Sequence, residues 1–381
     1  MTAWRAILDD EQAARARDAV RDVEAALTPE AVASSGHALG SGSPGIALLH
    51  VALGDTDRAE AVLDTAIEAV AEEPRVGLGF YGTTVGLSWA LSAIGRRLGL
   101  DDPDESDLDQ YVPRALAAGP WPGHFDLING LVGLGAYCLE RLPRPSARSG
   151  LDAVVAQLAG LARRSDGGVA WFTTPAIYPP RAQAYPEGHW DVGFAHGNAG
   201  VVALLAAATR EGVAEAEPLL RDAVRWLSSW RGPAEGAFPA IVTPEGVRAP
   251  ARMAWCYGDP GVALALLAAG RALGDAALLE AARDVALGCA GRVETSGIVD
   301  ASLCHGTAGA GHLFNRLGQA LGEERLVDLA RFWLLRALDE WATPVAAYGL
   351  LEGAAGTALA LLSATGEDPW WDYPLLLGTA G

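Results

Sequence analysis

Two short sequences carry the residues best suited to chemistry. Trp255-Cys256-Tyr257-Gly258 supplies one thiol, and Leu303-Cys304-His305-Gly306 supplies a second thiol and an imidazole. Zinc commonly takes thiolate and imidazole ligands together, and three protein ligands leave its fourth coordination position open. An open position is typical of a metal that takes part in a reaction. The sequence therefore predicts one zinc ion per chain, held by Cys256, Cys304 and His305.

The same glycine pattern follows both sequences and recurs along the chain. Each cysteine sequence continues into Gly-x-x-Gly and then an apolar segment. Seven such units have their second glycine at Gly45, Gly86, Gly133, Gly200, Gly261, Gly309 and Gly356. Their spacings of 41 to 67 residues fit one helical hairpin per unit, and one unit has Thr83 in place of its first glycine. A repeat of this length is typical of stacked helical pairs.

Each unit is predicted to contain two helices of different character. The helix after the glycines, here called the inner helix, is apolar nearly all round, as in residues 261–270, and such a helix is buried. The other helix is amphipathic, as in Ala216 to Trp230 and Arg325 to Trp341. This alternation predicts an all-α protein, an α/α toroid of seven helical hairpins with short β or loop excursions at its rim. We expect a single domain over residues 1–381.

Parallel inner helices would place all their N-termini at one end of the ring. Residues just before each glycine pair would then converge, which would bring Cys256, Cys304, His305 and His196 together. Two stretches, 167–191 and 232–250, depart from the helical pattern and lead into glycine units. They are either part of this active end or surface loops without function, and the second could form a short hairpin.

The composition narrows the class of protein. The chain has 381 residues, of which 50% are hydrophobic and 20% charged, and its net charge is −19 at pH 7. Such an acidic chain is a poor partner for nucleic acid, because phosphate binding needs a basic surface. No signal sequence or membrane-spanning apolar run is evident, and four cysteines are too few for a disulfide framework. We expect a cytoplasmic protein with reduced thiols and no integral membrane segment.

The sequences HGNAG, WCYGDPG and LCHGTAG, together with the seven glycine units, resemble the lanthionine synthetase C-like family over roughly Gly42 to Leu362. Among its members, the class I lanthipeptide (lantibiotic) cyclases are free-standing enzymes of about this length. The resemblance implies an α/α toroid with a zinc ion at one end. It also implies addition of peptide cysteine thiols to dehydroalanine or dehydrobutyrine, which forms thioether rings. The substrate would be a dehydrated precursor peptide of leader plus core, and a separate dehydratase is a possible partner.

The resemblance implies roles for individual residues as well. Its zinc ligands are matched by Cys256, Cys304 and His305, and its catalytic histidine is matched by His196 in Phe194-Ala-His-Gly. The acidic residue that contacts this histidine, and two further active-site positions, are matched by Asp126, Arg252 and Tyr257.

Plainer interpretations of these residues stay open. His196 could be a buried core histidine, Asp126 a helix N-cap and Arg252 a surface arginine. Two further cysteines, Cys138 and Cys289, lie in apolar helical segments and are expected to be structural.

The implied chemistry gives each part a physical role. A peptide thiol is mostly protonated at pH 7, and binding to zinc would deprotonate it. Attack of the thiolate on the β-carbon of the dehydro residue produces an enolate, which then needs a proton at the α-carbon. Arg252 and the helix N-termini can stabilise the negative charge. His196, oriented by Asp126, is the best proton donor, although it could instead take the thiol proton first.

Three other functions remain alternatives. A relative could use the same zinc site to add glutathione or another free thiol to dehydro residues. A helical-hairpin glycosidase would need paired carboxylates facing the cavity, and only Asp126 lies beside a glycine unit in a plausible place. A non-enzymatic, peptide-binding zinc protein would need no catalytic group at all.

Overall fold

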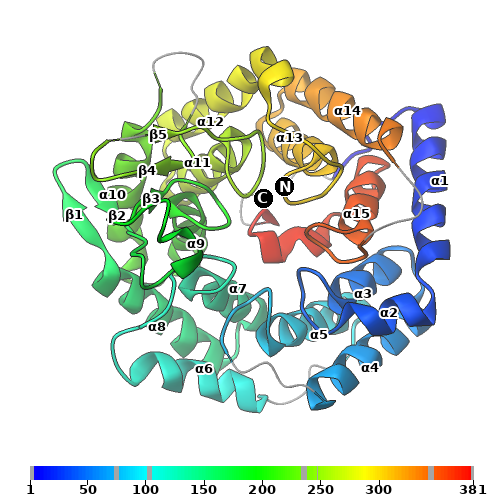
Figure 1. Cartoon of the computed structure of the whole chain (residues 1–381), viewed down its shortest axis with the longest axis horizontal. Helices are drawn as coiled ribbons and strands as arrows, with labels where there is room; N and C mark the ends of the chain where they lie inside the picture. Colours follow the sequence, from blue (N-terminus) through cyan, green and yellow to red (C-terminus); the bar gives the residue numbers. More distant parts are fainter. Residues whose placement is uncertain are drawn as a thin grey trace. The chain divides into compact units, whose positions relative to one another are not determined.

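The computed structural model describes residues 4–72, 77–100, 105–232, 238–246, 248–341 and 347–378. They form two compact units, one of Met1–Asp102 with Ile298–Asp372 and the other of Pro103–Gly297 with Tyr373–Gly381. The chain begins in the first unit, builds the second and then returns. In Figure 1, the first unit therefore takes the blue and the orange-to-red ends of the colour scale. The expected single domain stays a prediction.

The first unit is helical throughout its described residues. Its helices are α1 (Asp10–Ala26), α2 (Pro29–Ser35), α3 (Ser43–Ala52), α4 (Thr56–Glu72), α5 (Thr84–Leu98), α13 (Thr307–Leu321), α14 (Glu324–Asp339) and α15 (Ala354–Ala364). The inner helix α3 packs between α5 and α15, and α15 packs on α13. On their outer side, α4 covers α3 and α14 covers α13, whereas α15 is covered by the first helix of the chain, α1.

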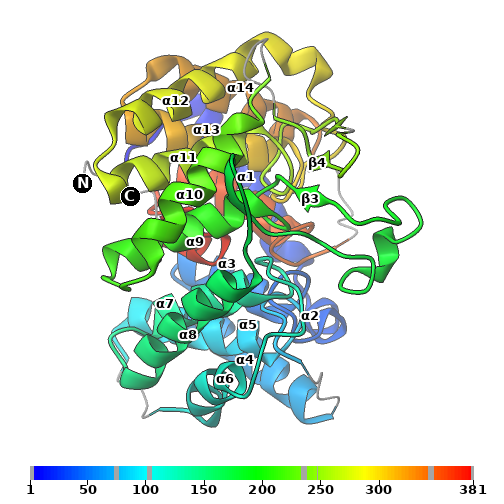
Figure 2. The same ribbon diagram turned by 90° about the vertical axis from the view of Figure 1, so that its left-hand side faces the viewer.

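The second unit repeats this arrangement. Its helices are α6 (Asp107–Ala117), α7 (Leu131–Arg141), α8 (Pro145–Leu161), α9 (Asn198–Arg210), α10 (Ala216–Ser229), α11 (Asp259–Leu273) and α12 (Ala276–Gly288), with short 3₁₀ helices η1 (Pro179–Arg181) and η2 (Cys289–Thr295). A third 3₁₀ helix, η3 (Trp370–Leu375), has its first three residues in the first unit and its last three in the second. The inner helix α9 packs between α7 and α11, and their outer partners are α8, α10 and α12. Figure 2 shows the pairs of this unit side by side.

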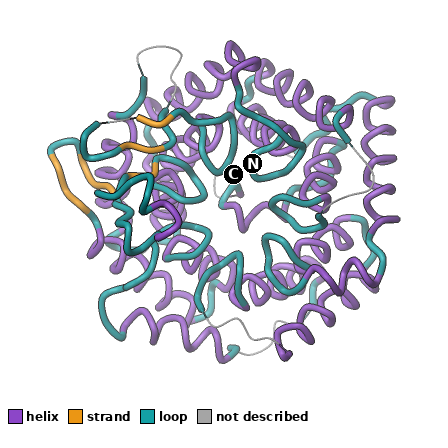
Figure 3. The backbone as a smooth tube through the Cα atoms, in the orientation of Figure 1, coloured by secondary structure: helices purple, strands orange, loops and turns teal. Residues whose placement is uncertain are grey.

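Both non-helical stretches of the sequence contribute strands to the second unit (Figure 3). β1 (Arg163–Ser165) and β2 (Gly168–Ala170) form one antiparallel pair. β3 (Trp190–Asp191), β4 (Ile241–Val242) and β5 (Arg248–Ala249) form an antiparallel sheet in that order. The short hairpin that the sequence allowed within 232–250 is present as the antiparallel pair β4 and β5, and residues 233–237 and 247 of that stretch lie outside the described residues.

The glycine units start helices because the chain doubles back over the first helical turn. A Cβ atom at Gly200 would lie 2.1 Å from the carbonyl oxygen of Phe194, and one at Gly309 would lie 2.0 Å from that of Leu303. Only glycine leaves room for so close an approach. In the unit that lacks its first glycine, Thr83 caps α5 instead, because its hydroxyl accepts the N–H of Val85 at 3.3 Å.

The burial of the helices agrees with the predicted inner and outer roles. Every residue of α15 is buried, and so is nearly every residue of α9 and α11, because their side chains are small and apolar. The outer helix α10 buries one face and exposes its charged residues. Within the described ranges, none of the helices combines the length and the apolar character that crossing a bilayer requires.

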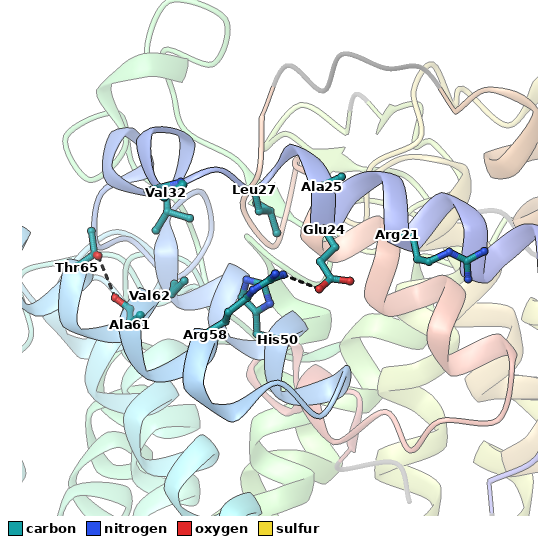
Figure 4. Close-up of a pocket in the computed structure, with 11 residues that line it drawn as sticks. Arg21, Glu24, Ala25, Leu27, Val32, His50, Arg58, Ala61, Val62 and Thr65 are labelled. Carbon is teal, nitrogen blue, oxygen red and sulfur yellow. Dashed lines mark hydrogen bonds and ion pairs between the residues drawn. The ribbon is translucent and has the colours of Figure 1, made fainter.

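A pocket of about 700 Å³ opens in the first unit between α1, α2 and the α3–α4 hairpin (Figure 4). His50, near the end of α3, lines it; its side chain is buried, and its Nδ1 has no hydrogen-bond partner among the described residues. Arg58 of α4 forms a 2.6 Å ion pair with Glu24 of α1 at the same pocket. Burial lowers the pKa of His50, although the carboxylates of Asp55 and Glu24 oppose this shift.

Candidate functional site

The turns that precede the inner helices of the first unit are joined by backbone hydrogen bonds. The N–H of Cys304 donates to Leu351 at 2.8 Å, that of Leu351 donates to Gly40 at 2.8 Å, and that of Gly40 donates to Tyr81 at 3.1 Å. These four residues precede α13, α15, α3 and α5 respectively. The turns therefore lie side by side, as expected for inner helices that run in one direction.

In the second unit the same kind of contact joins the turns that carry Asp126 and His196. The N–H of Leu127 donates to the carbonyl of Ala195 at 3.1 Å. Beside this bond, His196 Nδ1 lies 2.9 Å from Asp126 Oδ2. The other oxygen, Asp126 Oδ1, accepts the N–H of Asn129 at 2.8 Å. Asp126 thus stabilises its own turn with one oxygen, as a capping residue would, and contacts His196 with the other.

The proximity of Asp126 and His196 changes the acidity of both groups. Burial raises the pKa of Asp126, but the imidazoles of His124 and His196 outweigh burial and hold that pKa well below its usual range. Burial lowers the pKa of His196, but the hydrogen bond and charge of Asp126 more than offset it, so that the pKa is raised. The pair therefore favours an ionised carboxylate beside a readily protonated imidazole.

His124 is a neighbour of this pair that we did not select from the sequence. Its Nδ1 accepts the backbone N–H of Asp126 at 3.0 Å, and its ring stacks on Phe125. The only available signal was its position two residues before Asp126, which is equally typical of a loop histidine.

Cys256 and Tyr257 precede α11 and lie next to His196. The rings of Tyr257 and His196 stack with their centroids 5.7 Å apart and their planes at 19°. Cys256 is buried, and its carbonyl oxygen would lie 2.2 Å from a Cβ atom at Gly193, which shows how closely the two turns approach. The turns before α7, α9 and α11 therefore bring Asp126, His196, Tyr257 and Cys256 to one place in the second unit.

The hydroxyl of Tyr257 leads to a second residue that the sequence did not reveal. It donates to Asp191 Oδ1 at 3.0 Å, and Asp191 also accepts from Arg181 at 2.8 Å. The guanidinium carbon of Arg181 lies 5.1 Å from the centre of the Tyr257 ring. Asp191 closes the proline-rich stretch 167–191, which sequence analysis left as either part of the site or a loop without function.

Cys304 and His305 precede α13 in the first unit. Cys304 is buried, whereas the side chain of His305 is 20% exposed, and its Nε2 lies 3.1 Å from Asp300 Oδ2. Within the described part of the chain, one group of metal-binding side chains could hold an ion, and it consists of Cys256, Cys304 and His305. Two thiols and one imidazole form a donor set that suits zinc.

Comparison with known proteins identifies the family. Residues 34–375 match the family model of the lanthionine synthetase C-like protein. The chain belongs to the lanthionine synthetase C-like family. Among solved structures, nisin cyclase is similar, with a TM-score of 0.78 and 20% sequence identity over 95% of this chain and 97% of that chain. No curated protein sequence matches. The structural likeness confirms the predicted fold class, an all-α protein of the α/α toroid type.

Arg252, the remaining residue that the family resemblance selected, is less closely tied to this site. Arg252 is exposed, and its carbonyl oxygen would lie 1.9 Å from a Cβ atom at Gly258, so the backbone of this residue helps to shape the turn before α11. A role for its side chain stays a prediction.

Cys138 and Cys289 are buried; burial raises the pKa of the Cys138 thiol to about 12, and the thiol of Cys289 donates to the carbonyl of Val285 at 3.5 Å. These are the properties expected of structural thiols.

Proposed function

We propose that this chain is a zinc-dependent lanthipeptide cyclase. It would add cysteine thiols of a dehydrated precursor peptide to dehydroalanine or dehydrobutyrine in the same peptide, and so form lanthionine and methyllanthionine rings. Membership of the lanthionine synthetase C-like family supports a reaction of this type. The observation that carries the proposal is the His196–Asp126 pair beside Cys256, because it combines a candidate proton donor with a candidate metal ligand.

The proposed zinc ligands are Cys256, Cys304 and His305. Their donor set fits zinc, and three ligands leave a position for a substrate thiol. When bound, zinc lowers the pKa of a coordinating thiol and so supplies a thiolate nucleophile at neutral pH. The four cysteines of the chain are free thiols, which agrees with the reducing cytoplasm that we propose as its location.

His196 is proposed to move the proton. Its Nδ1 faces Asp126, which leaves Nε2 as the atom that can meet the substrate. The raised pKa of His196 favours the protonated form, which can deliver a proton to the α-carbon after the new carbon–sulfur bond has formed. The substrate thiol loses one proton and the α-carbon gains one, so the peptide keeps its mass. Tyr257 covers one face of the imidazole and restricts the direction from which the substrate approaches.

A thiol-trapping assay tests this function. A dehydrated, cysteine-bearing precursor peptide that includes its leader is incubated with the protein, and free thiols are then alkylated and counted by mass spectrometry. We expect fewer alkylated thiols than in a control without protein. Equal alkylation in both would count against cyclase activity on that peptide. An added arm with glutathione distinguishes the free-thiol alternative, because that reaction increases the peptide mass by one glutathione per dehydro residue.

A further inference from the structure

Asp191 is a buried carboxylate that four side chains of the second unit contact, three from residues 173–189 and one from the turn before α11. Its side chain is only 2% exposed. Oδ1 accepts the hydroxyl of Tyr257 at 3.0 Å and Nη1 of Arg181 at 2.8 Å. Oδ2 accepts the hydroxyl of Thr173 at 3.2 Å and lies 3.0 Å from Nε2 of His189. A buried charge is tolerated when it is paired and hydrogen-bonded in this way.

The contact between Asp191 and Tyr257 fixes the ring that stacks on His196. The ring of Tyr257 stacks on that of His196, with their centroids 5.7 Å apart. The hydroxyl of Tyr257 is bound by Asp191. A largely buried tyrosine hydroxyl needs a partner of this kind. With both ends of the ring fixed, Tyr257 has one orientation relative to the imidazole.

The other contacts shape the segment 174–188, here called the Arg181 loop. Thr173 and His189 pair at its base, where the N–H of each donates to the carbonyl of the other at 2.8 and 3.0 Å. Within the loop, η1 carries Arg181 to Asp191, and the ring of Tyr178 meets that of His124 edge-on at 5.9 Å. Figure 2 shows this green segment standing out from the helices beside β3. Asp191 therefore fixes an otherwise exposed loop against the residues around Asp126.

We propose that Asp191 is a positioning residue of the candidate site, which holds Tyr257 against His196 and anchors the Arg181 loop as one wall of the peptide-binding surface. The inference rests on the proposed function for the identity of the substrate. The anchoring itself depends only on contacts within the second unit. Asp191→Asn keeps the size of the side chain but removes its charge, so Arg181 loses its ion pair, and the two groups next to the new amide nitrogen lose the oxygen that they contacted.

Limited proteolysis measures the anchoring without any substrate. Trypsin can cut after Arg181, whose side chain is 28% exposed and ion-paired in the folded protein. We expect Asp191→Asn to be cut there about tenfold faster, as loss of a charge-assisted hydrogen bond predicts, with an unchanged helical circular-dichroism signal. Asp222→Asn is the matched control, because this acid of the same unit pairs with Arg164 and Arg225, whose side chains are exposed. Equal cleavage of Asp191→Asn and wild type would overturn the inference.

A second variant covers the case in which Asp191→Asn does not fold. Arg181→Gln breaks the same ion pair from the exposed side, and cleavage after Glu187 by a glutamate-specific protease then reports on the loop. Faster cleavage than in wild type supports the anchor, and unchanged cleavage contradicts it.

A double-mutant cycle then tests whether Asp191 acts through Tyr257. We expect Asp191→Asn and Tyr257→Phe each to lower kcat for thiol loss by about tenfold, and the double variant to be no slower than either one. Independent, multiplied effects would contradict positioning through Tyr257. We expect Arg181→Gln mainly to raise KM for the peptide. Because proteolysis needs no peptide, failure of the cyclase assay alone would reject the proposed function, whereas unchanged proteolysis would reject the anchor.

Discussion

Replacing Asp126 by asparagine separates orientation of the proposed catalytic histidine, His196, from proton transfer. In the structure, Oδ2 of Asp126 lies 2.9 Å from His196 Nδ1, while Oδ1 accepts the N–H of Asn129 at 2.8 Å. The amide of Asp126→Asn can keep the bond to Asn129 and so preserve the turn before α7. It offers no negative charge to the imidazole, and its nitrogen cannot accept the proton of Nδ1.

The size of the effect follows from that single contact. A hydrogen bond to a charged group contributes about 1.5–3 kcal/mol, and a factor of ten in rate corresponds to about 1.4 kcal/mol. If His196 is protonated in the rate-limiting step, Asp126→Asn should lower kcat by about 10- to 150-fold. His196→Asn removes the proton donor itself, and general acid–base groups contribute about 10²- to 10⁴-fold. The loss in His196→Asn should therefore be the larger of the two.

The assay compares the rate of thiol loss and the zinc content of each variant. Both variants should retain zinc, because neither residue belongs to the proposed ligand set, and Asp222→Asn should match wild type in both measurements. If Asp126→Asn or His196→Asn forms rings at the wild-type rate, the pair is structural and the proton must come from elsewhere. If either variant loses zinc, the residue supports the metal site and the proposed division of roles is wrong.

Three further predictions test the metal, the buried histidine and the glycine units. Metal analysis should find near-stoichiometric zinc in wild type, little in Cys304→Ala and an unchanged amount in Cys138→Ala; chelation should leave the helical circular-dichroism signal intact. Because burial lowers the pKa of His50 in the folded state, wild type should lose stability as the pH falls below about 6.5, and His50→Leu should show a smaller fall in Tm between about pH 7.5 and pH 5. An equal fall in both proteins would exclude His50 as a cause. Gly200→Ala places a Cβ atom 2.1 Å from a carbonyl oxygen and should destabilise the fold by about 1–3 kcal/mol in urea unfolding, whereas Gly160→Ala meets nothing within 4 Å and should stabilise it by about 0.5–1 kcal/mol.

The sequence predicted those parts of the fold that local interactions decide. The inner helices begin at the glycine units because the backbone folds back on itself there, and this requirement is visible in the residue type alone. A short hairpin was likewise suggested for residues 232–250 from that stretch alone, and β4 and β5 pair there. The partner of the last inner helix was not predicted. α15 is covered by α1 from the other end of the chain, where Ile7 donates its N–H to Ala364 at 2.9 Å, and no repeat pattern includes such a pair.

In the candidate site, too, the sequence predicted some features and missed others. The thiols and His196 were expected to converge because each stands beside a glycine unit, and Asp126 was selected by the family resemblance. The structure joins His196 to Asp126 as expected. His124 and Asp191 also stand close to glycine units, but their chemistry depends on partners that the sequence cannot assign. Asp191 is an ordinary acidic residue at the end of a loop until Arg181 and Tyr257, which lies 66 residues further along the chain, reach it.

The close contact at Gly193 explains why neighbouring turns must be considered together. A Cβ atom there would lie 2.2 Å from the carbonyl oxygen of Cys256 and 2.6 Å from the ring of Tyr257. Gly193 belongs to the turn that carries His196, so the position of a proposed zinc ligand in one repeat is set by the absence of a side chain in the repeat before it. The same reasoning applies in the first unit, where the N–H of Cys304 is fixed by Leu351 of the following repeat. The two proposed thiol ligands are therefore placed by an adjacent turn as well as by their own glycines, which is why the spacing of the repeats predicts the convergence but not the contacts.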